Sequence, residues 1–418
     1  MIIFVLMKSM MLRQKIWLFL VGLCFTSLLY KPITFVWVSC AFLIHWLIDK
    51  NLLDKIRRAF TNKKTWPFYA FFLLQLLWCI KTNYKNEAVI QMERAIFLVV
   101  FPIILSSENY LSAKVEKILL RIFSIALLAS LCYAFCHAIY SFHFLKDVPL
   151  KNVLLNRGQL SIATIWHPGH YSVFIAFLIL WNYTHLKYQT VWRFIYILLF
   201  SIPLIIFTSR TVLPFCVLFV LLELLNSASK RTNKFKSRFL AILLIVIGSL
   251  LLYSIPSINK RVRDTLQNIN NINLTVGDSD ATAARRVIYQ NNIELIKDKP
   301  MRGYGLGASH IELKEKLFKE GYQKLAADDI GAHSEYLKIF IEQGILGILI
   351  FLFLLFFISR EFYKNIKENK MEFWMSLLII LTFLTDSMFD FTRFAVFYPF
   401  FWSLFMFREN EETQALTL

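Results

Sequence analysis

The stretch GAHSEYLKIFIEQGILGILIFLFLLFF, residues 331–357, contains both a membrane-helix pattern and a cluster of ionisable side chains. Its second half is a continuous apolar run, and the pattern predicts a helix over 336–358 that is long enough to cross a bilayer. Directly before this helix stand His333, Ser334 and Glu335, which can donate or accept hydrogen bonds and protons. The stretch therefore predicts a membrane span with ionisable and polar side chains at its N-terminal end.

The composition of the whole chain is that of a membrane protein. Of its 418 residues 57% are hydrophobic and 18% charged, and the mean hydropathy is +0.54. Apolar runs of about 17 to 25 residues recur along most of its length. Because a helix satisfies its own backbone hydrogen bonds inside lipid, these runs predict an all-α, polytopic membrane protein. We expect about twelve transmembrane helices, near residues 16–30, 33–49, 66–80, 94–106, 118–142, 169–184, 193–208, 211–226, 239–255, 336–358, 372–388 and 393–407.

The basic residues predict the orientation of these spans. The net charge of +18 lies in loops between apolar runs and not among stacking aromatic residues, so no nucleic-acid partner is expected. The loops that fall on one side carry Lys50, Lys55, Arg57, Arg58, Lys63, Lys64, Lys230, Arg231, Lys234, Lys236, Arg238, Arg360, Lys364, Lys367 and Lys370. This side of the multi-pass protein is predicted to be cytoplasmic, with both termini, and in a bacterial cell the opposite side is the periplasm or outer surface.

The domain organisation follows from the same count of spans. Residues 1–256 are expected to hold the first nine helices, with a shorter periplasmic loop near 143–168. Residues 257–335 form a long, partly helical periplasmic loop, and residues 336–418 hold the last three helices and a cytoplasmic tail. The apolar N-terminal run has no small-residue cleavage site and is predicted to be a retained helix. All six cysteines fall in apolar segments without metal-type spacing, so neither disulfides nor zinc is expected.

Three arginines are candidates for binding an anion on the external side. Arg210, in TSRT between two closely spaced spans, is either a snorkelling interfacial residue or a clamp for an anion in an external cavity. Arg285 and Arg286 fall in the first turn of an amphipathic helix predicted over 282–297, where a helix N-terminus already favours anions. They are either a solvated charge pair or part of the same anion site.

His333 is the candidate for proton chemistry. It follows an arginine-containing loop, and nearby arginines are expected to lower its pKa and keep it neutral, as a general base requires. Glu335 does not share its helical face and is expected to have a supporting role. His167 and His170, in HPGHYSVF, mark another external helix start and are further supporting candidates. Because carboxylates at ligand spacing are missing, no metal site is predicted.

External arginines and a neutral histidine together predict transfer of a group from a lipid diphosphate to a hydroxyl. The arginines stabilise charge on the departing diphosphate, and the histidine takes the proton of the attacking hydroxyl. A flippase or exporter of lipid-linked glycans is the hypothesis from another class. It predicts mid-span charges and repeat symmetry, whereas Asp386, Asp390 and Arg393 are expected to form an ion-paired helix end.

These motifs resemble the O-antigen ligase and O-antigen polymerase superfamily of bacterial envelope proteins. The resemblance covers mainly residues 200–358 and rests on TSRT, on ARRVIYQ followed by KP and GYGLG, and on HSEYLKIFIEQGILG. It implies a GT-C-type fold. It also implies transfer of a glycan from undecaprenyl diphosphate to an acceptor sugar hydroxyl on the periplasmic face, without a metal or another cofactor.

The resemblance also implies roles for individual residues. His333 matches the catalytic histidine of the superfamily, and Arg210 matches its arginine after the seventh span. The arginine of the long loop is Arg285 or the adjacent Arg286. Arg94, in MERAIFLVVFP, is a further basic contact to the substrate.

Ligases, polymerases and protein O-oligosaccharyltransferases in this superfamily share the diphosphate site and differ in their acceptor. We expect a ligase with lipid A-core as acceptor, because the histidine-containing end of the loop matches that pattern best. A polymerase that extends the glycan on its lipid carrier is the alternative. The protein-glycosylating branch is disfavoured because no long external domain follows the last span.

Overall fold

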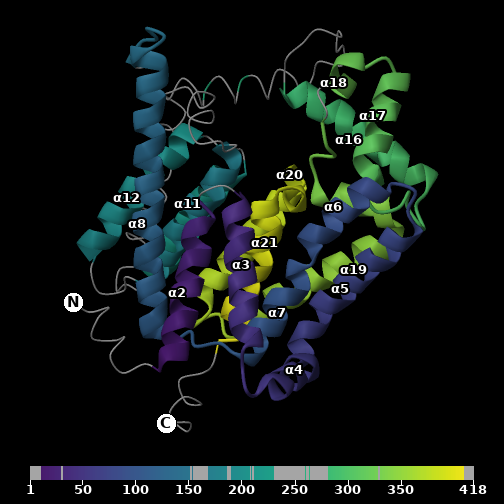
Figure 1. Ribbon diagram of the computed structural model, residues 1–418. Coiled ribbons are helices and arrows are strands. Elements are labelled where there is room, and N and C mark those ends of the chain that lie inside the picture. Colours follow the sequence, from purple (N-terminus) through teal and green to yellow (C-terminus); the bar gives the residue numbers. More distant parts are fainter. Residues whose placement is uncertain are drawn as a thin grey trace. The chain divides into compact units, whose positions relative to one another are not determined.

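The computed structural model describes residues 11–29, 32–150, 153, 168–185, 190–207, 209, 211–229, 259, 263, 281–327 and 330–408. Within these residues every regular element is a helix and no strand is present, which confirms the predicted all-α class (Figure 1). The chain forms two compact units, one from Met1–Ala129 with Ile288–Leu418 and the other from Ser130–Val287.

The first unit contains most of the described helices. In chain order they are α2 (Leu12–Ser27), α3 (Pro32–Leu47), α4 (Leu52–Thr61), η1 (Lys63–Thr65), α5 (Trp66–Lys81), α6 (Lys85–Ala95), α7 (Phe97–Ser107), the first part of α8 (Ala113–Ala138), α16 (Ala281–Asp298) from Ile288 on, α17 (Ala308–Lys319), α18 (Gln323–Ala327), α19 (Glu335–Lys364), α20 (Lys370–Thr385), η3 (Met388–Asp390) and α21 (Thr392–Met406).

Helix α21 is the centre of this unit. Every residue from Phe394 to Met406 is buried, and the helix packs against α3, α6, α7, α19 and α20 (Figure 1). A helix that is apolar on all sides needs such a surround of other helices or lipid. The ring of Phe400 lies 5.2–6.2 Å from the rings of Phe25, Phe35 and Phe101. These aromatic contacts join α2, α3 and α7 to α21.

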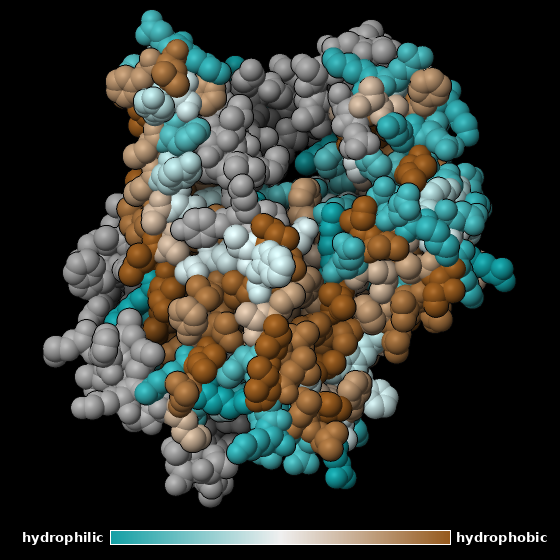
Figure 2. All heavy atoms as spheres, in the orientation of Figure 1, coloured by the Kyte–Doolittle hydropathy of each residue, from teal (hydrophilic) through white to brown (hydrophobic). Residues whose placement is uncertain are grey.

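The surface of the first unit separates into hydrophobic and hydrophilic regions. Exposed apolar side chains such as Trp37, Ile44, Leu73 and Leu77 lie on α3 and α5, and Figure 2 shows a hydrophobic surface over this part of the unit. The surface over α17 and α18 is mostly hydrophilic in the same view. Side chains that face outward yet are apolar are typical of contact with lipid.

The second unit is built around α11 (Pro168–His185), which packs against α12 (Thr190–Phe207) and α13 (Val212–Ser229). It also contains the end of α8, the π-helix η2 (Ile139–Phe144) and the first turns of α16. Aromatic pairs hold its helices together: the Tyr171 and Phe207 rings are 5.5 Å apart, and those of Tyr183 and Phe219 are 5.1 Å apart.

The membrane spans can be compared with their predicted positions. Three stretches of the described chain are long and apolar enough to cross a membrane by themselves, Lys85–Ser107, Ala113–Phe144 and Glu335–Lys364, and a fourth arises if α3 and α4 are counted together. Eleven of the twelve predicted spans coincide with helices, and the one at 239–255 lies outside the described residues. Several of those helices have only 15 or 16 residues, so the count of twelve stays a prediction.

Candidate functional site

The backbone at His333 is held in an uncommon conformation. Its φ is +51°, in the left-handed region that few non-glycine residues adopt. Two side chains of α16 bind the carbonyl groups of this turn: the Tyr289 hydroxyl donates to the His333 carbonyl at 3.0 Å, and the Asn292 amide donates to the Ala332 carbonyl at 3.0 Å. Left-handed strain persists only where the surroundings fix it, and α16 supplies that constraint.

Ser334 fixes the other side of the same turn. Its hydroxyl caps the first turn of α19 by accepting from the Leu337 N–H at 3.5 Å, and it donates to the Phe383 carbonyl of α20 at 3.3 Å. The short polar sequence before the span is thus a helix cap bound to a second helix. Three helices, α16, α19 and α20, therefore determine where the His333 side chain lies.

The imidazole of His333 faces a carboxylate. Its Nδ1 atom lies 3.8 Å from Oδ1 of Asp386, which follows the last residue of α20, and both side chains are partly exposed, at 30% and 20%. The predicted charged neighbours of this histidine were arginines, but in the described part of the chain its ion-pair partner is this carboxylate. The distance exceeds a hydrogen bond, so Asp386 acts on the ring through its charge, and the two side chains form an ion pair only when the imidazole carries a proton.

Both carboxylates of the predicted ion-paired helix end face charged or ionisable groups at the start of α19. Asp386 faces His333, whereas Asp390 forms an ion pair with Lys338 of α19. Glu335 is buried, and its carboxylate accepts a hydrogen bond from the Phe389 N–H at 2.9 Å and lies 3.9 Å from the Lys338 ammonium. Glu335 thus binds the segment between α20 and α21 to the start of α19.

A polar cavity lies inside the first unit along α19. Its lining includes Gln75, Gln91, Arg94, Glu335, Lys338 and Glu342. Glu342 accepts hydrogen bonds from the Gln91 amide at 3.0 Å and the Ser309 hydroxyl at 2.8 Å. The guanidinium of Arg94 makes no hydrogen bond or ion pair with the residues that the structure describes. Charged groups inside a membrane protein usually mark a functional region. The sequence pattern pointed to Glu342 only through the family resemblance and did not point to Lys338, which stands in an otherwise apolar run.

The glycine-rich stretch GYGLG docks on a kink in α19. At Gly344 the backbone has φ 64° and ψ −160°, which interrupts the helix. The Tyr304 and Gly305 N–H groups donate to the Ile341 and Glu342 carbonyls at 2.8 and 2.9 Å, and the Ile345 N–H donates to the Pro300 carbonyl at 2.9 Å. These hydrogen bonds fix the loop to α19.

Replacing Gly344 by Ala is expected to destabilise the protein by at least about 2 kcal/mol, because its backbone region is almost restricted to glycine and the new methyl would overlap the Met301 carbonyl. Thermal unfolding of the purified protein in detergent measures this loss. Gly321 is a matched control: it also has a positive φ, 87°, but nothing lies within 4 Å of a Cβ there. Equal losses for both Ala variants would contradict the proposed overlap.

The other predicted residues fall in different places. Arg285 is half-buried and Arg286 exposed, so of the two adjacent arginines Arg285 is the one turned toward protein. It stands one helical turn before Tyr289 in α16. His170 is buried in α11 of the second unit. Arg210 and His167 lie outside the described residues.

No group of three or more His, Cys, Asp or Glu side chains that could hold a metal ion occurs in the described part of the chain. The chemical groups gathered around the His333 turn are an imidazole, a carboxylate beside it and polar groups that fix the backbone. Such an arrangement suits proton transfer between a bound hydroxyl and the imidazole.

A family comparison identifies which part of the chain resembles known proteins. The model of the family described as O-antigen ligase matches residues 194–352. Over this segment, which is less than half of the chain, the protein is similar to the O-antigen ligase family. No curated protein matches it.

The O-antigen ligase match covers only part of the site. It begins in α12 and ends in α19, eight residues after the kink, so it includes Arg285, the glycine loop and the His333 turn. Arg94 and Asp386 lie outside it. The similarity to this glycosyltransferase-like family supports an enzyme, and the apolar helices together with the family support a membrane protein.

Proposed function

We propose that this O-antigen ligase homologue transfers a glycan from undecaprenyl diphosphate to a sugar hydroxyl of lipid A-core. The reaction takes place at the periplasmic face of a bacterial inner membrane, where the loop helices α16 to α18 meet the start of α19, and both termini lie in the cytoplasm. The His333 turn is the observation that supports this function most directly, because a strained, well-anchored histidine beside a carboxylate stands inside the matched family region.

In the proposed reaction His333 is the general base. With Nδ1 toward Asp386, the Nε2 atom is the ring nitrogen that accepts the proton of the acceptor hydroxyl. The hydroxyl oxygen then forms a bond to the anomeric carbon of the donor glycan. The bond from that carbon to the diphosphate oxygen breaks, and its electron pair leaves with undecaprenyl diphosphate. The Asp386 carboxylate stabilises the imidazolium while it carries the proton.

Arginines bind the diphosphate in this proposal. Arg285 is favoured over Arg286 because it is the less exposed of the two, and Arg210 keeps its role from the family resemblance. Arg94 has no ion-pair partner among the described residues, which leaves its guanidinium available for an anion. Arginine donors that bind phosphate oxygens stabilise the charge that grows on the leaving group, so a metal ion is not required for that task.

An assay with purified, reconstituted protein tests this function. The donor is a glycan on undecaprenyl diphosphate and the acceptor is lipid A-core; we expect glycan on lipid A-core, and the same yield in the presence of EDTA. Longer glycan on the carrier lipid would instead identify a polymerase, which uses the same site with a different acceptor. A donor that remains intact with both acceptors would refute the proposed transfer.

A further inference from the structure

Helix α4 lies across the direction of the span that precedes it. It has ten residues, Leu52–Thr61, and its axis is bent by 112° from that of α3. In the sequence this segment is recognisable only as a basic loop. A short helix that turns through about a right angle at the end of a span runs roughly parallel to the membrane surface.

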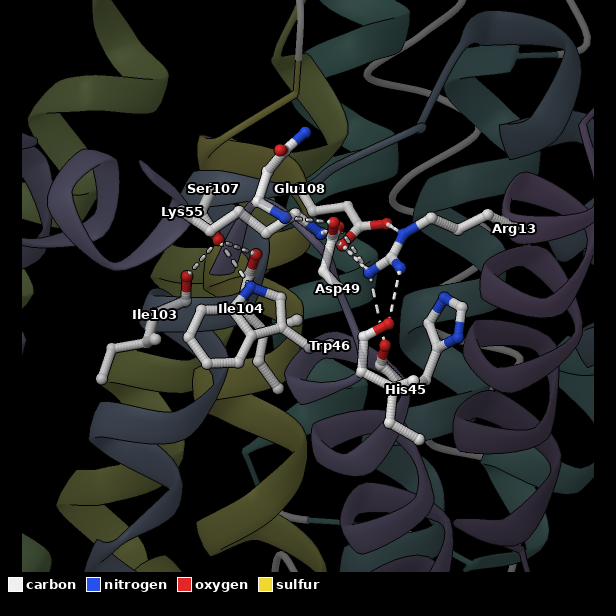
Figure 3. A network of polar contacts seen from close by, with 11 residues as sticks. Arg13, His45, Trp46, Asp49, Lys55, Ile103, Ile104, Ser107 and Glu108 are labelled. Atoms are coloured by element: carbon white, nitrogen blue, oxygen red, sulfur yellow. Dashed lines mark hydrogen bonds and ion pairs between the residues drawn. The ribbon is translucent and has the colours of Figure 1, made fainter. Parts of the chain in front are cut away.

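One face of α4 is fixed to the protein. Lys55 and Ala59, one helical turn apart, are buried, and the Lys55 ammonium pairs with the carboxylates of Asp49 and Glu108 (Figure 3). Arg13 completes the cluster: its Nε and Nη2 atoms lie 2.7 and 2.9 Å from the two oxygens of Glu108, and Nη2 lies 2.9 Å from Asp49. The cluster joins α4 to the ends of α2, α3 and α7.

This cluster is neutral and its charges are paired with one another. Two cations face two carboxylates, and Arg13 also donates to the His45 and Ile48 carbonyls at 3.3 and 3.4 Å (Figure 3). Burial alone would raise the pKa of Glu108, but hydrogen bonds and charge from Arg13 and Lys55 hold that pKa below its ordinary value. The cluster therefore anchors α4 and presents no free charge to a ligand.

A second face of α4 is apolar and uncovered. Leu53 is 82% exposed and Phe60, seven residues later, is 53% exposed. Residues seven apart lie on one side of a helix, so the two side chains form a stripe. Trp66, 62% exposed, stands next to this stripe and donates its indole N–H to the Phe60 carbonyl at 3.2 Å. Tryptophan beside exposed apolar residues is typical of the boundary between lipid and water.

A third face of α4 is basic. Arg57 and Arg58 are exposed, and Lys63 and Lys64 follow as exposed residues in η1. At 100° per residue, Arg57 falls about 40° from Leu53, on the side opposite the buried face. Its guanidinium therefore emerges at the edge of the apolar stripe, where the phosphate of a lipid headgroup lies if the stripe enters the acyl region.

We propose that α4 is a surface helix that binds anionic phospholipid. Leu53 and Phe60 enter the boundary of the acyl chains, and Arg57 and Arg58 bind headgroup phosphates. Charge complementarity favours this occupant over a second copy of the chain, because two such basic faces repel one another. By the predicted orientation the helix lies on the cytoplasmic leaflet, where it sets the depth of the α2, α3 and α7 ends that the buried cluster joins.

Native mass spectrometry of the detergent-solubilised full chain tests this proposal. We expect phosphatidylglycerol to bind on the order of ten times more tightly than phosphatidylcholine, and the double variant Arg57→Gln/Arg58→Gln to lose most of this preference. The pair Leu53→Gln/Phe60→Gln is expected to weaken binding of both lipids equally. Arg57 and Arg58 are exposed, so the unfolding temperature of the arginine variant should stay unchanged.

The matched control removes two exposed charges elsewhere, in Lys314→Gln/Lys319→Gln of α17, and is expected to keep the preference. Persistence of the preference in the arginine variant, or an equal loss in the control, would overturn the proposal. A concentration-dependent dimer that disappears when α4 is altered, without any lipid preference, would show instead that a second copy covers this face.

Discussion

Replacing His333 by Asn is expected to reduce glycan transfer by a factor of about 10² to 10⁴ while the protein stays folded in the membrane. Asparagine is the informative replacement because it tolerates the left-handed backbone found at this position, with φ +51°, yet cannot act as a base. The Tyr289 and Asn292 bonds to the turn involve backbone carbonyls, so the variant keeps them. Product formation in the reconstituted assay and unfolding temperature are the two measurements.

The control for this variant is His310→Asn in α17, which removes a histidine of the same loop region. We expect that control to retain transfer. His333→Ala should lose transfer as well and also unfold at a lower temperature than His333→Asn, because alanine is strained at positive φ. Transfer at the unaltered rate by folded His333→Asn protein would rule out the general-base role.

Hydropathy and local pattern were sufficient to predict the helical class and the position of the histidine turn. The long apolar run of α19 and the polar residues before it are contiguous in the sequence, so they directly predict a membrane helix with polar residues at its N-terminal end. The start of the fourth predicted span was less well placed. The helical stretch begins at Lys85, well before residue 94, because α6 is polar at its start and joins α7 with only Ile96 between them. Arg94 is therefore inside a helix.

The contacts that complete the candidate site depend on the tertiary fold. Asp386 stands 53 residues after His333, and only the packing of α20 against α19 brings them together. The kink at Gly344 and its pairing with the loop at Gly305 likewise involve segments far apart in sequence. Glycines with positive φ can belong to a mobile turn or to a tightly fixed contact, and their spacing alone does not distinguish the two. Helix α4 was not predicted, because its ten residues are rich in basic side chains and the segment resembles a loop between two spans.

Asp386→Asn is expected to lower the kcat of transfer by on the order of 10²-fold or more and to leave the KM for the acceptor unchanged. Asparagine preserves the size of the side chain and the acceptor atom for the Ser387 N–H, which Asp386 Oδ1 now binds at 3.0 Å. It removes the negative charge that stabilises the imidazolium of His333 and orients its ring. Asp386→Glu restores the charge on a longer side chain, and partial recovery of kcat is expected.

A variant of the neighbouring Asp390 distinguishes a positioning role of Asp386 from a structural role. Asp390→Asn removes the ion pair with buried Lys338, so we expect a lower unfolding temperature but near-normal kcat per folded molecule. A structural role for Asp386 would give the same pattern as Asp390, with no recovery in the Glu variant. A fall in kcat for Asp386→Asn that is reversed in part by Glu, at constant stability, requires the charge beside His333 and thereby ties the end of α20 to the proton transfer.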